Sequence, residues 1–285
     1  MNNIFNIKRL GLAFRKDILE GRKRYALMFL TMLGIIAVML TWNYWEHYDD
    51  VERYGNQNTI IYTNKDILSY LSLMFGGFGI IFASTFASPM NSKLKKLSYL
   101  VSPSSNFEKY LTRWIIVTVA YIISFFIAMW VADAIRVAIC SARFPNLDIA
   151  FVDLTKLVHP GKYEYRSDYF FPKEAFIIYV SAYLLLQSFF VLGSTFWEKS
   201  SFIKTFTAMA LIVLSYILIC RWTILLFYGE LDTFGNVLSS FKPDEIDFEE
   251  EKNFIIAASV ISVFTFANWA LAYFRLRESE ITKRI

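Results

Sequence analysis

The chain has 285 residues, of which 56 % are apolar and 18 % are aromatic, including 28 phenylalanines. This apolar content exceeds what one soluble core needs, so the composition excludes an ordinary soluble domain and predicts a membrane protein. The net charge is only +4, and the basic residues gather between alternate apolar runs, so no nucleic-acid partner is expected.

The first segment, residues 4–21, has the pattern of a helix that lies in the membrane interface. Charged residues fall on one side of this helix and apolar residues fall on the other. The apolar side carries Ile7, Leu10, Phe14 and Ile18. The segment lacks a short apolar core followed by a small-residue cleavage site, so we expect the first span to remain as an anchor.

Six apolar runs are each long enough to cross about 30 Å of hydrocarbon at about 1.5 Å per residue. We expect spans at residues 25–42, 67–87, 114–139, 175–197, 205–228 and 254–274. These predict an all-α polytopic membrane protein in which residues 1–285 form a single transmembrane domain. In the second span, Gly79, Ala83 and Ala87 recur every four residues, which predicts close helix packing within the subunit.

The distribution of charge predicts the orientation, because Lys and Arg near spans are retained on the cytoplasmic side. With both termini inside, the inner segments carry 18 of the 29 Lys and Arg residues and the outer loops carry nine. The charge distribution therefore predicts a multi-pass membrane protein with both termini in the cytoplasm. The loop at residues 140–171 is the longest, and we expect it to be an ordered extracytoplasmic segment.

The basic connector between the second and third spans, residues 87–113, is unlike every other loop, and we call it the elbow. Its first half places Met90, Leu94, Leu97 and Val101 at helical spacing beside three lysines, which predicts a short amphipathic helix. Such a helix fits the groove of a cytoplasmic partner. The same pattern also fits a basic inside loop whose helix rests on lipid.

The second half of the elbow contains a break and a new helix start. Pro103 follows Ser102 and ends the first helix, because proline removes a backbone donor and restricts the residue before it. Ser105 and Glu108, three residues apart, predict a capping box at the start of the third span.

Three charged residues lie within predicted spans, near their outer ends. Asp133 and Arg136 are spaced i, i+3 and can neutralise each other, and Arg221 is close enough to its span end to snorkel. A structural role is expected for them ahead of a role in binding cargo. The two cysteines, Cys140 and Cys220, follow no disulfide motif and are expected to be inert thiols.

Several kinds of chemistry are missing from the sequence. It has no GxxxxGK[ST] phosphate loop, no HExxH and no GxSxG, and no cofactor or metal site is expected. His47 and His159 lie in separate outer loops without ligand spacing. We find no cluster of polar residues within the spans, so an enzyme is not expected.

The string LSYLVSPSSNFEKYLTRWI, set within this topology, resembles permeases of the type-two ABC exporter family, especially its divergent bacterial branch. The resemblance implies a coupling helix that contacts a separate cytoplasmic ATPase, and a signature turn after it. The chain has Lys95-Lys96 where the family often has Glu-Arg, and its loop between the third and fourth spans is long. The implied coupling residues are Lys93, Leu94, Lys95, Lys96, Leu97 and Leu100, and the implied signature turn comprises Ser102, Pro103, Ser105, Glu108 and Lys109.

This resemblance implies a permease subunit that pairs with a second permease copy or homologue and with ATPase subunits, in contact with membrane lipid. ATP hydrolysis would take place in the partner and no bond would be made in this chain. The alternative is a non-transporting membrane anchor or sensor that binds a partner through its outer loops. A membrane-embedded enzyme is a third and weaker alternative.

Overall fold

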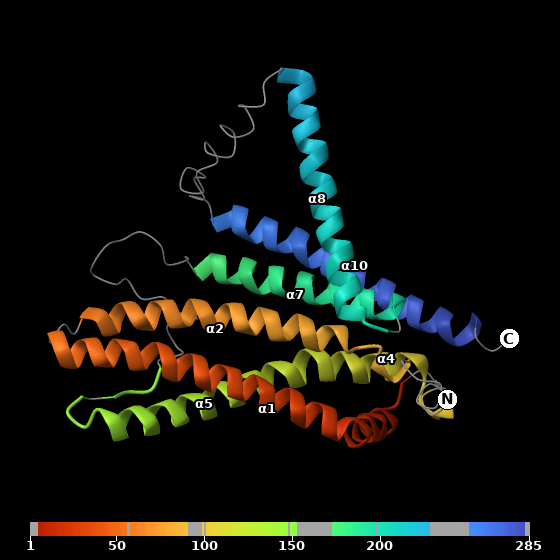
Figure 1. Ribbon diagram of the computed structural model, residues 1–285. Coiled ribbons are helices and arrows are strands. Elements are labelled where there is room, and N and C mark those ends of the chain that lie inside the picture. The colour runs from red at the N-terminus through yellow and green to blue at the C-terminus, as the bar shows by residue number, and fades with distance from the viewer. Residues whose placement is uncertain are drawn as a thin grey trace.

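The structure is a computed structural model that describes residues 5–55, 58–90, 99, 101–147, 149–152, 173–197, 199–228 and 251–282. Within these ranges every regular element is helical and no strand occurs. Six helices are long and apolar enough to cross a membrane. The chain is therefore an all-helical, multi-pass membrane protein, as its composition predicted (Figure 1).

All six predicted spans fall largely within helices, although several helices extend past the predicted ends. The first span lies within α1 (Ile7–Tyr54) and the second in α2 (Asn58–Ser84). The third is built from α4 (Asn106–Ile115), the π turn η2 (Ile116–Ala120) and α5 (Tyr121–Arg143). The last three correspond to α7 (Lys173–Phe196), α8 (Ser201–Tyr228) and α10 (Glu251–Thr282).

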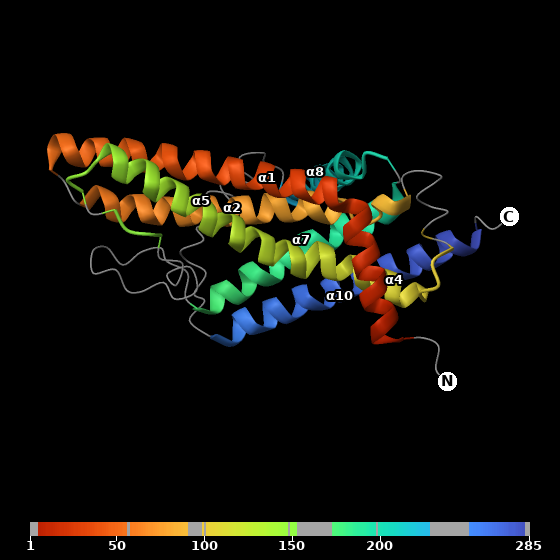
Figure 2. The ribbon, with the colours of Figure 1, turned by 90° about the horizontal axis from the view of Figure 1, so that it is seen from below.

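Helix α1 joins the predicted interfacial helix and the first span without a break. Asn6 caps its start by accepting the Lys8 N–H at 2.9 Å, and Gly55 ends it at a φ of 68°, which glycine adopts without strain. Figure 2 shows that the N-terminal part of α1 turns away from the long part of the helix and runs toward α4. The interfacial segment is thus a bent extension of the first span.

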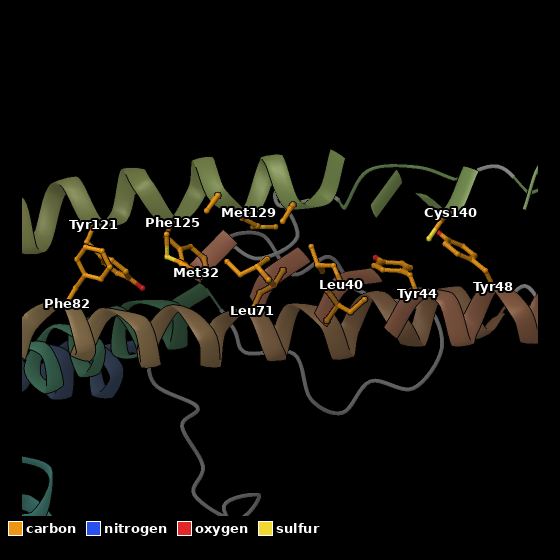
Figure 3. Close-up of a cluster of buried hydrophobic side chains, with 14 of the residues drawn as sticks. Met32, Leu40, Tyr44, Tyr48, Leu71, Phe82, Tyr121, Phe125, Met129 and Cys140 are labelled. Carbon is orange, nitrogen blue, oxygen red and sulfur yellow. The ribbon is translucent and has the colours of Figure 1, made fainter. Parts of the chain in front are cut away.

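The main core lies where α1, α2 and α5 meet. On α1 the buried residues recur every four positions, and α5 presents a matching stripe, so the two helices pack along their lengths (Figure 3). The α1 stripe is Met32, Ile36, Leu40, Tyr44 and Tyr48, and the α5 stripe includes Tyr121, Phe125, Met129 and Cys140. Both cysteines are free thiols.

A second core lies at the elbow end of the bundle, where α2, α4, α7 and α10 meet. Met90 is buried in it, within the short 3₁₀ turn η1 (Ser88–Met90). The elbow therefore begins inside the protein, and Met90 is not on the surface of an amphipathic helix. The core also holds Phe86, Tyr110, Phe190 and Leu276.

Small residues allow close helix approaches around α7. A Cβ at Gly79 would lie 2.5 Å from the hydroxyl oxygen of Tyr183, and Ala83 and Ala87 are buried, so this stripe of α2 packs within the subunit as predicted. At the other contact, Gly193 of α7 lies against Thr205 of α8. Beyond that contact α8 crosses away from the bundle, and most of its apolar side chains are exposed (Figure 1).

Replacing Gly193 with valine is expected to separate α8 from α7. A Cβ at this position would overlap Thr205, which is itself buried, so the free energy of unfolding should fall by about 1–3 kcal/mol. Thermal unfolding of the purified protein in detergent measures the change. Gly77→Val is the matched control, because a Cβ there meets no atom within 4 Å. Equal effects of the two substitutions would contradict this close contact.

Candidate functional site

The second half of the elbow starts helix α4 with the predicted capping box. The Ser105 hydroxyl oxygen accepts the Glu108 N–H at 3.2 Å, and the Glu108 Oε2 accepts the Ser105 N–H at 2.9 Å. Before this cap, the hydroxyls of Ser102 and Ser104 are hydrogen-bonded at 3.0 Å. The chain thus turns sharply at Ser102 to Ser105 and enters α4 with its first N–H groups satisfied.

Glu108 also binds the start of α1. Its second oxygen, Oε1, accepts the backbone N–H of Asn6 at 2.7 Å and two donors of Arg9, Nε at 3.2 Å and Nη2 at 3.0 Å. The Glu108 side chain is fully buried. One carboxylate therefore caps α4 and holds the first turn of α1 against it.

A second ion pair joins the same two helices further along. The Arg113 Nη2 lies 2.7 Å from the Asp17 Oδ1, and both side chains are largely buried. The Arg113 Nη1 also donates to the Tyr25 hydroxyl at 3.2 Å, at the beginning of the predicted first span. We call Arg9, Asp17, Glu108 and Arg113 the junction. Its two pairs have opposite polarity, so the four charges cancel.

A small cavity of about 40 Å³ lies beside the junction, between α1 and the elbow. Its wall includes Asp17 and Arg113 of the junction together with Ser102, Ser104 and Lys109 of the elbow. Above it, the Lys109 ammonium lies 5.2 Å from the centre of the Tyr99 ring. The junction is therefore polar on the side that faces the elbow.

The structure brings together one of the two sets of predicted site residues in the elbow. The predicted signature turn, Ser102 to Lys109, contributes Glu108 to the junction. The coupling residues Lys93, Leu94, Lys95, Lys96, Leu97 and Leu100 lie outside the described residues. The roles of Arg9, Asp17 and Arg113 were not predicted. The signal that could have found them is the presence of Asp17 and Glu108, two acids, within otherwise basic segments.

Asp133 and Arg136 form a buried ion pair near the far end of the bundle. The Arg136 Nε donates to the Asp133 Oδ1 at 2.7 Å, and the Arg136 side chain has no exposed surface. Its guanidinium also lies 4.0 Å from the centre of the Tyr44 ring and donates to the Tyr48 hydroxyl at 3.1 Å. The pair is therefore part of the contact between α1 and α5, and the prediction of mutual neutralisation is confirmed.

This pair also holds the segment that follows α5. The Arg136 Nη2 donates to the Ala150 carbonyl at 2.7 Å, and the Asp133 Oδ2 accepts the Val152 N–H at 2.8 Å. Residues 149–152, within the predicted outer loop at residues 140–171, are thus attached to the bundle. Arg221, in contrast, is exposed on α8 and forms no ion pair with any described residue.

A polar cluster within the spans was not predicted. The Gln187 amide of α7 donates to the Val117 carbonyl at 3.2 Å and the Thr118 hydroxyl at 3.1 Å, both in the π turn η2. Beside it, the Asn268 amide of α10 donates to the Ser188 hydroxyl at 2.9 Å. The expectation of no polar cluster was wrong because Gln187, Thr118 and Asn268 are far apart in sequence. The cluster contains amides and hydroxyls, and a π turn disturbs regular helix bonding in a way that a neighbouring amide can compensate.

Comparison with models of known protein families, with curated proteins and with solved structures found no match to this chain. Among the described residues, no group of three or more His, Cys, Asp or Glu side chains could hold a metal ion. The resemblance to exporter permeases therefore depends on the elbow motif and the topology alone.

Replacing Glu108 with glutamine is expected to weaken the junction. The amide carries no charge for Arg9, and its nitrogen cannot accept the N–H groups that the carboxylate binds. We expect a loss of about 1.5–3 kcal/mol in the free energy of unfolding, the range for hydrogen bonds to charged groups. Glu20→Gln is the control, since Glu20 is more than half exposed and lies 3.8 Å from Lys16, a pair that contributes under about 1 kcal/mol. A Glu108→Gln protein as stable as the control would refute the junction.

Leucine substitutions should show that the two arginines within the predicted spans contribute differently to stability. Arg136→Leu leaves the buried Asp133 without its charge partner, which costs about 3–5 kcal/mol and should greatly lower the yield of folded protein. Arg221→Leu removes an exposed side chain and should change stability by less than about 0.5 kcal/mol. Size-exclusion profiles and thermal unfolding in detergent measure both. Equal yields and unfolding temperatures would show that the Asp133–Arg136 pair does not hold the bundle.

Proposed function

We propose that this protein is the membrane-spanning permease subunit of an ATP-driven exporter, which couples ATP hydrolysis by a separate cytoplasmic subunit to movement of a substrate across the membrane. The observation that carries the proposal is the junction. It ties α4, the helix that begins in the second half of the elbow, to the first helix of the chain through two largely buried ion pairs.

The junction supplies a physical route for such coupling. A partner that displaced the elbow would push on α4, which continues through η2 into α5. The Arg9–Glu108 and Asp17–Arg113 pairs would carry the same displacement into α1. Because α1 and α5 are packed along their buried stripes, they would move as one rigid unit relative to the remaining helices.

In this proposal a second permease copy or homologue completes the translocation path, and two ATPase subunits bind at the elbows in the cytoplasm of a bacterium. The exposed apolar surface of α8 and the outward faces of the other helices contact lipid or the second permease. No covalent chemistry is assigned to this chain.

A membrane anchor or sensor is the second candidate, and one observation favours it. Asp133 and Arg136 fasten residues 149–152 to the bundle, so the segment beyond α5 starts from a fixed point. A fixed outer segment suits recognition of a partner. In that case the elbow would be a basic inside loop, and no ATPase would bind to it.

Two substitutions in the elbow test the exporter proposal. Leu97→Asp places a charge where an apolar anchor is expected, and burial of one leucine contributes about 1.5–3 kcal/mol. We expect this variant to fold but to lose co-purification with the ATPase and substrate-stimulated ATP hydrolysis. Lys95→Ala is the control, because an exposed charge pair contributes under about 1 kcal/mol and is screened by salt.

Both variants are first checked for an unchanged unfolding temperature. If Leu97→Asp retains the ATPase and full activity, the elbow is not the coupling segment, and the anchor or sensor function becomes the better proposal. If no ATPase subunit binds the wild-type chain, the exporter proposal itself fails.

A further inference from the structure

A second, larger cavity lies at the same end of the bundle as the junction, and the Tyr25 hydroxyl accepts a hydrogen bond both from Arg113 of the junction and from Arg24 of the cavity wall. The cavity is open, has a volume of about 410 Å³, and is bounded by the residue that precedes the first span, the end of α2, η1 and the start of α8. Its polar wall consists of Arg24, Ser84, Thr85, Ser88, Ser200 and Ser201. Arg24 is the one charged residue among these lining residues, so the wall carries positive charge and no carboxylate.

Two polar groups on this wall lack partners among the described residues. Ser88 is 9 % exposed, and its hydroxyl oxygen is buried without a hydrogen bond. The Nε of Arg24 is buried in the same way. Buried polar groups are nearly always satisfied, so these two groups are available to a partner that enters the cavity. A guanidinium can only donate, so its partner must be an acceptor.

The start of α8 adds further donors to the wall. Ser201, Phe202 and Ile203 line the cavity and carry the first N–H groups of a 28-residue helix, whereas the next N–H, from Lys204, is bound by the Ser200 carbonyl at 3.1 Å. Such a terminus attracts anions. The Ser201 hydroxyl donates to the Ser84 carbonyl at 2.8 Å and fixes the terminus against α2.

The remaining hydroxyls on the wall are occupied within α2. The Ser84 hydroxyl donates to the Ile81 carbonyl at 2.6 Å, and the Thr85 hydroxyl donates to the Phe82 carbonyl at 2.8 Å. The Arg24 Nη2 donates to the Tyr25 hydroxyl at 3.3 Å. The donors left for a ligand are therefore the rest of the Arg24 guanidinium, Ser88 and the terminus of α8. Ser88 follows α2, Ser201 begins α8, and Arg24 lies within α1 directly before the predicted first span. Positions at the ends of spans are at the depth of lipid phosphates.

We propose that this cavity binds a phosphate group, either that of a lipid headgroup or that of a soluble phosphate compound. Arginine, a hydroxyl and helix N–H groups together match the oxygens of a phosphate. Exposed basic residues on the segments beside the cavity add to its attraction for anions: Arg22, Lys23, Lys199 and Lys204. The inference does not depend on the exporter proposal, since none of the residues that line the cavity belongs to the junction or to the predicted coupling residues.

The test titrates the purified full-length protein in detergent with three compounds: dioctanoyl-phosphatidylglycerol, dioctanoylglycerol and inorganic phosphate. Dioctanoylglycerol is the control, because it has the same acyl chains but no phosphate. Unfolding temperature and native mass spectrometry report binding. We expect saturable binding of a phosphate-bearing compound and none of dioctanoylglycerol. Arg24→Gln should raise the Kd by about tenfold or more, since it removes a charge-assisted contact. Its exposed neighbour Arg22→Gln should raise the Kd by less than about twofold.

Ser88→Ala is a second variant, and it tests the site even if Arg24→Gln does not fold. Because the Ser88 hydroxyl has no partner, its removal should leave the unfolding temperature unchanged without phosphate but raise the Kd several-fold. Binding of phosphatidylglycerol without competition from inorganic phosphate assigns the site to lipid, and competition assigns it to a soluble phosphate compound. Equal binding of dioctanoylglycerol, equal effects of Arg24→Gln and Arg22→Gln, or an unchanged Kd in Ser88→Ala would overturn the proposal.

Discussion

A fully buried carboxylate can remain ionised only when donors surround it, and Glu108 obtains its donors from two separate parts of the chain. The backbone of Ser105 and the capping geometry fix how α4 begins. Asn6 and Arg9 bring the start of α1 to the same carboxylate. Loss of either set would leave a buried charge unsatisfied, so the positions of α1 and α4 depend on each other.

Among the described residues, buried polar contacts join helices at three places along the bundle. Each fixes the position of one helix relative to another, which apolar packing alone would not do. The junction joins α1 to α4, Gln187 joins α7 to the π turn, and the Asp133–Arg136 pair joins α5 to α1. In lipid, apolar surfaces gain little by leaving the solvent, because the solvent is itself apolar. Directional contacts and close packing therefore determine which helix faces meet.

The same reasoning explains the position of α8. Most of its described side chains are apolar and exposed. Its contacts with the bundle lie near the start of the helix, where Gly193 allows Thr205 to approach and Ser201 binds the end of α2. A helix of this composition is stable in hydrocarbon without protein neighbours. The contacts that hold α8 are therefore concentrated in its first turns, beside the cavity of about 410 Å³.

The sequence by itself determined the class of protein and much of its local structure. Apolar run lengths located all six spans, and the Ser105–Glu108 spacing located the cap of α4, because both depend on residues near one another in the chain. The spacing of Asp133 and Arg136 likewise indicated their pairing, but only the tertiary structure decided which charges distant in sequence meet. Arg9 and Glu108 are 99 residues apart, and Gln187 and Thr118 are 69 apart, so no local pattern records their contact. Long-range polar contacts follow from how helices pack, and that packing is a property of the whole chain.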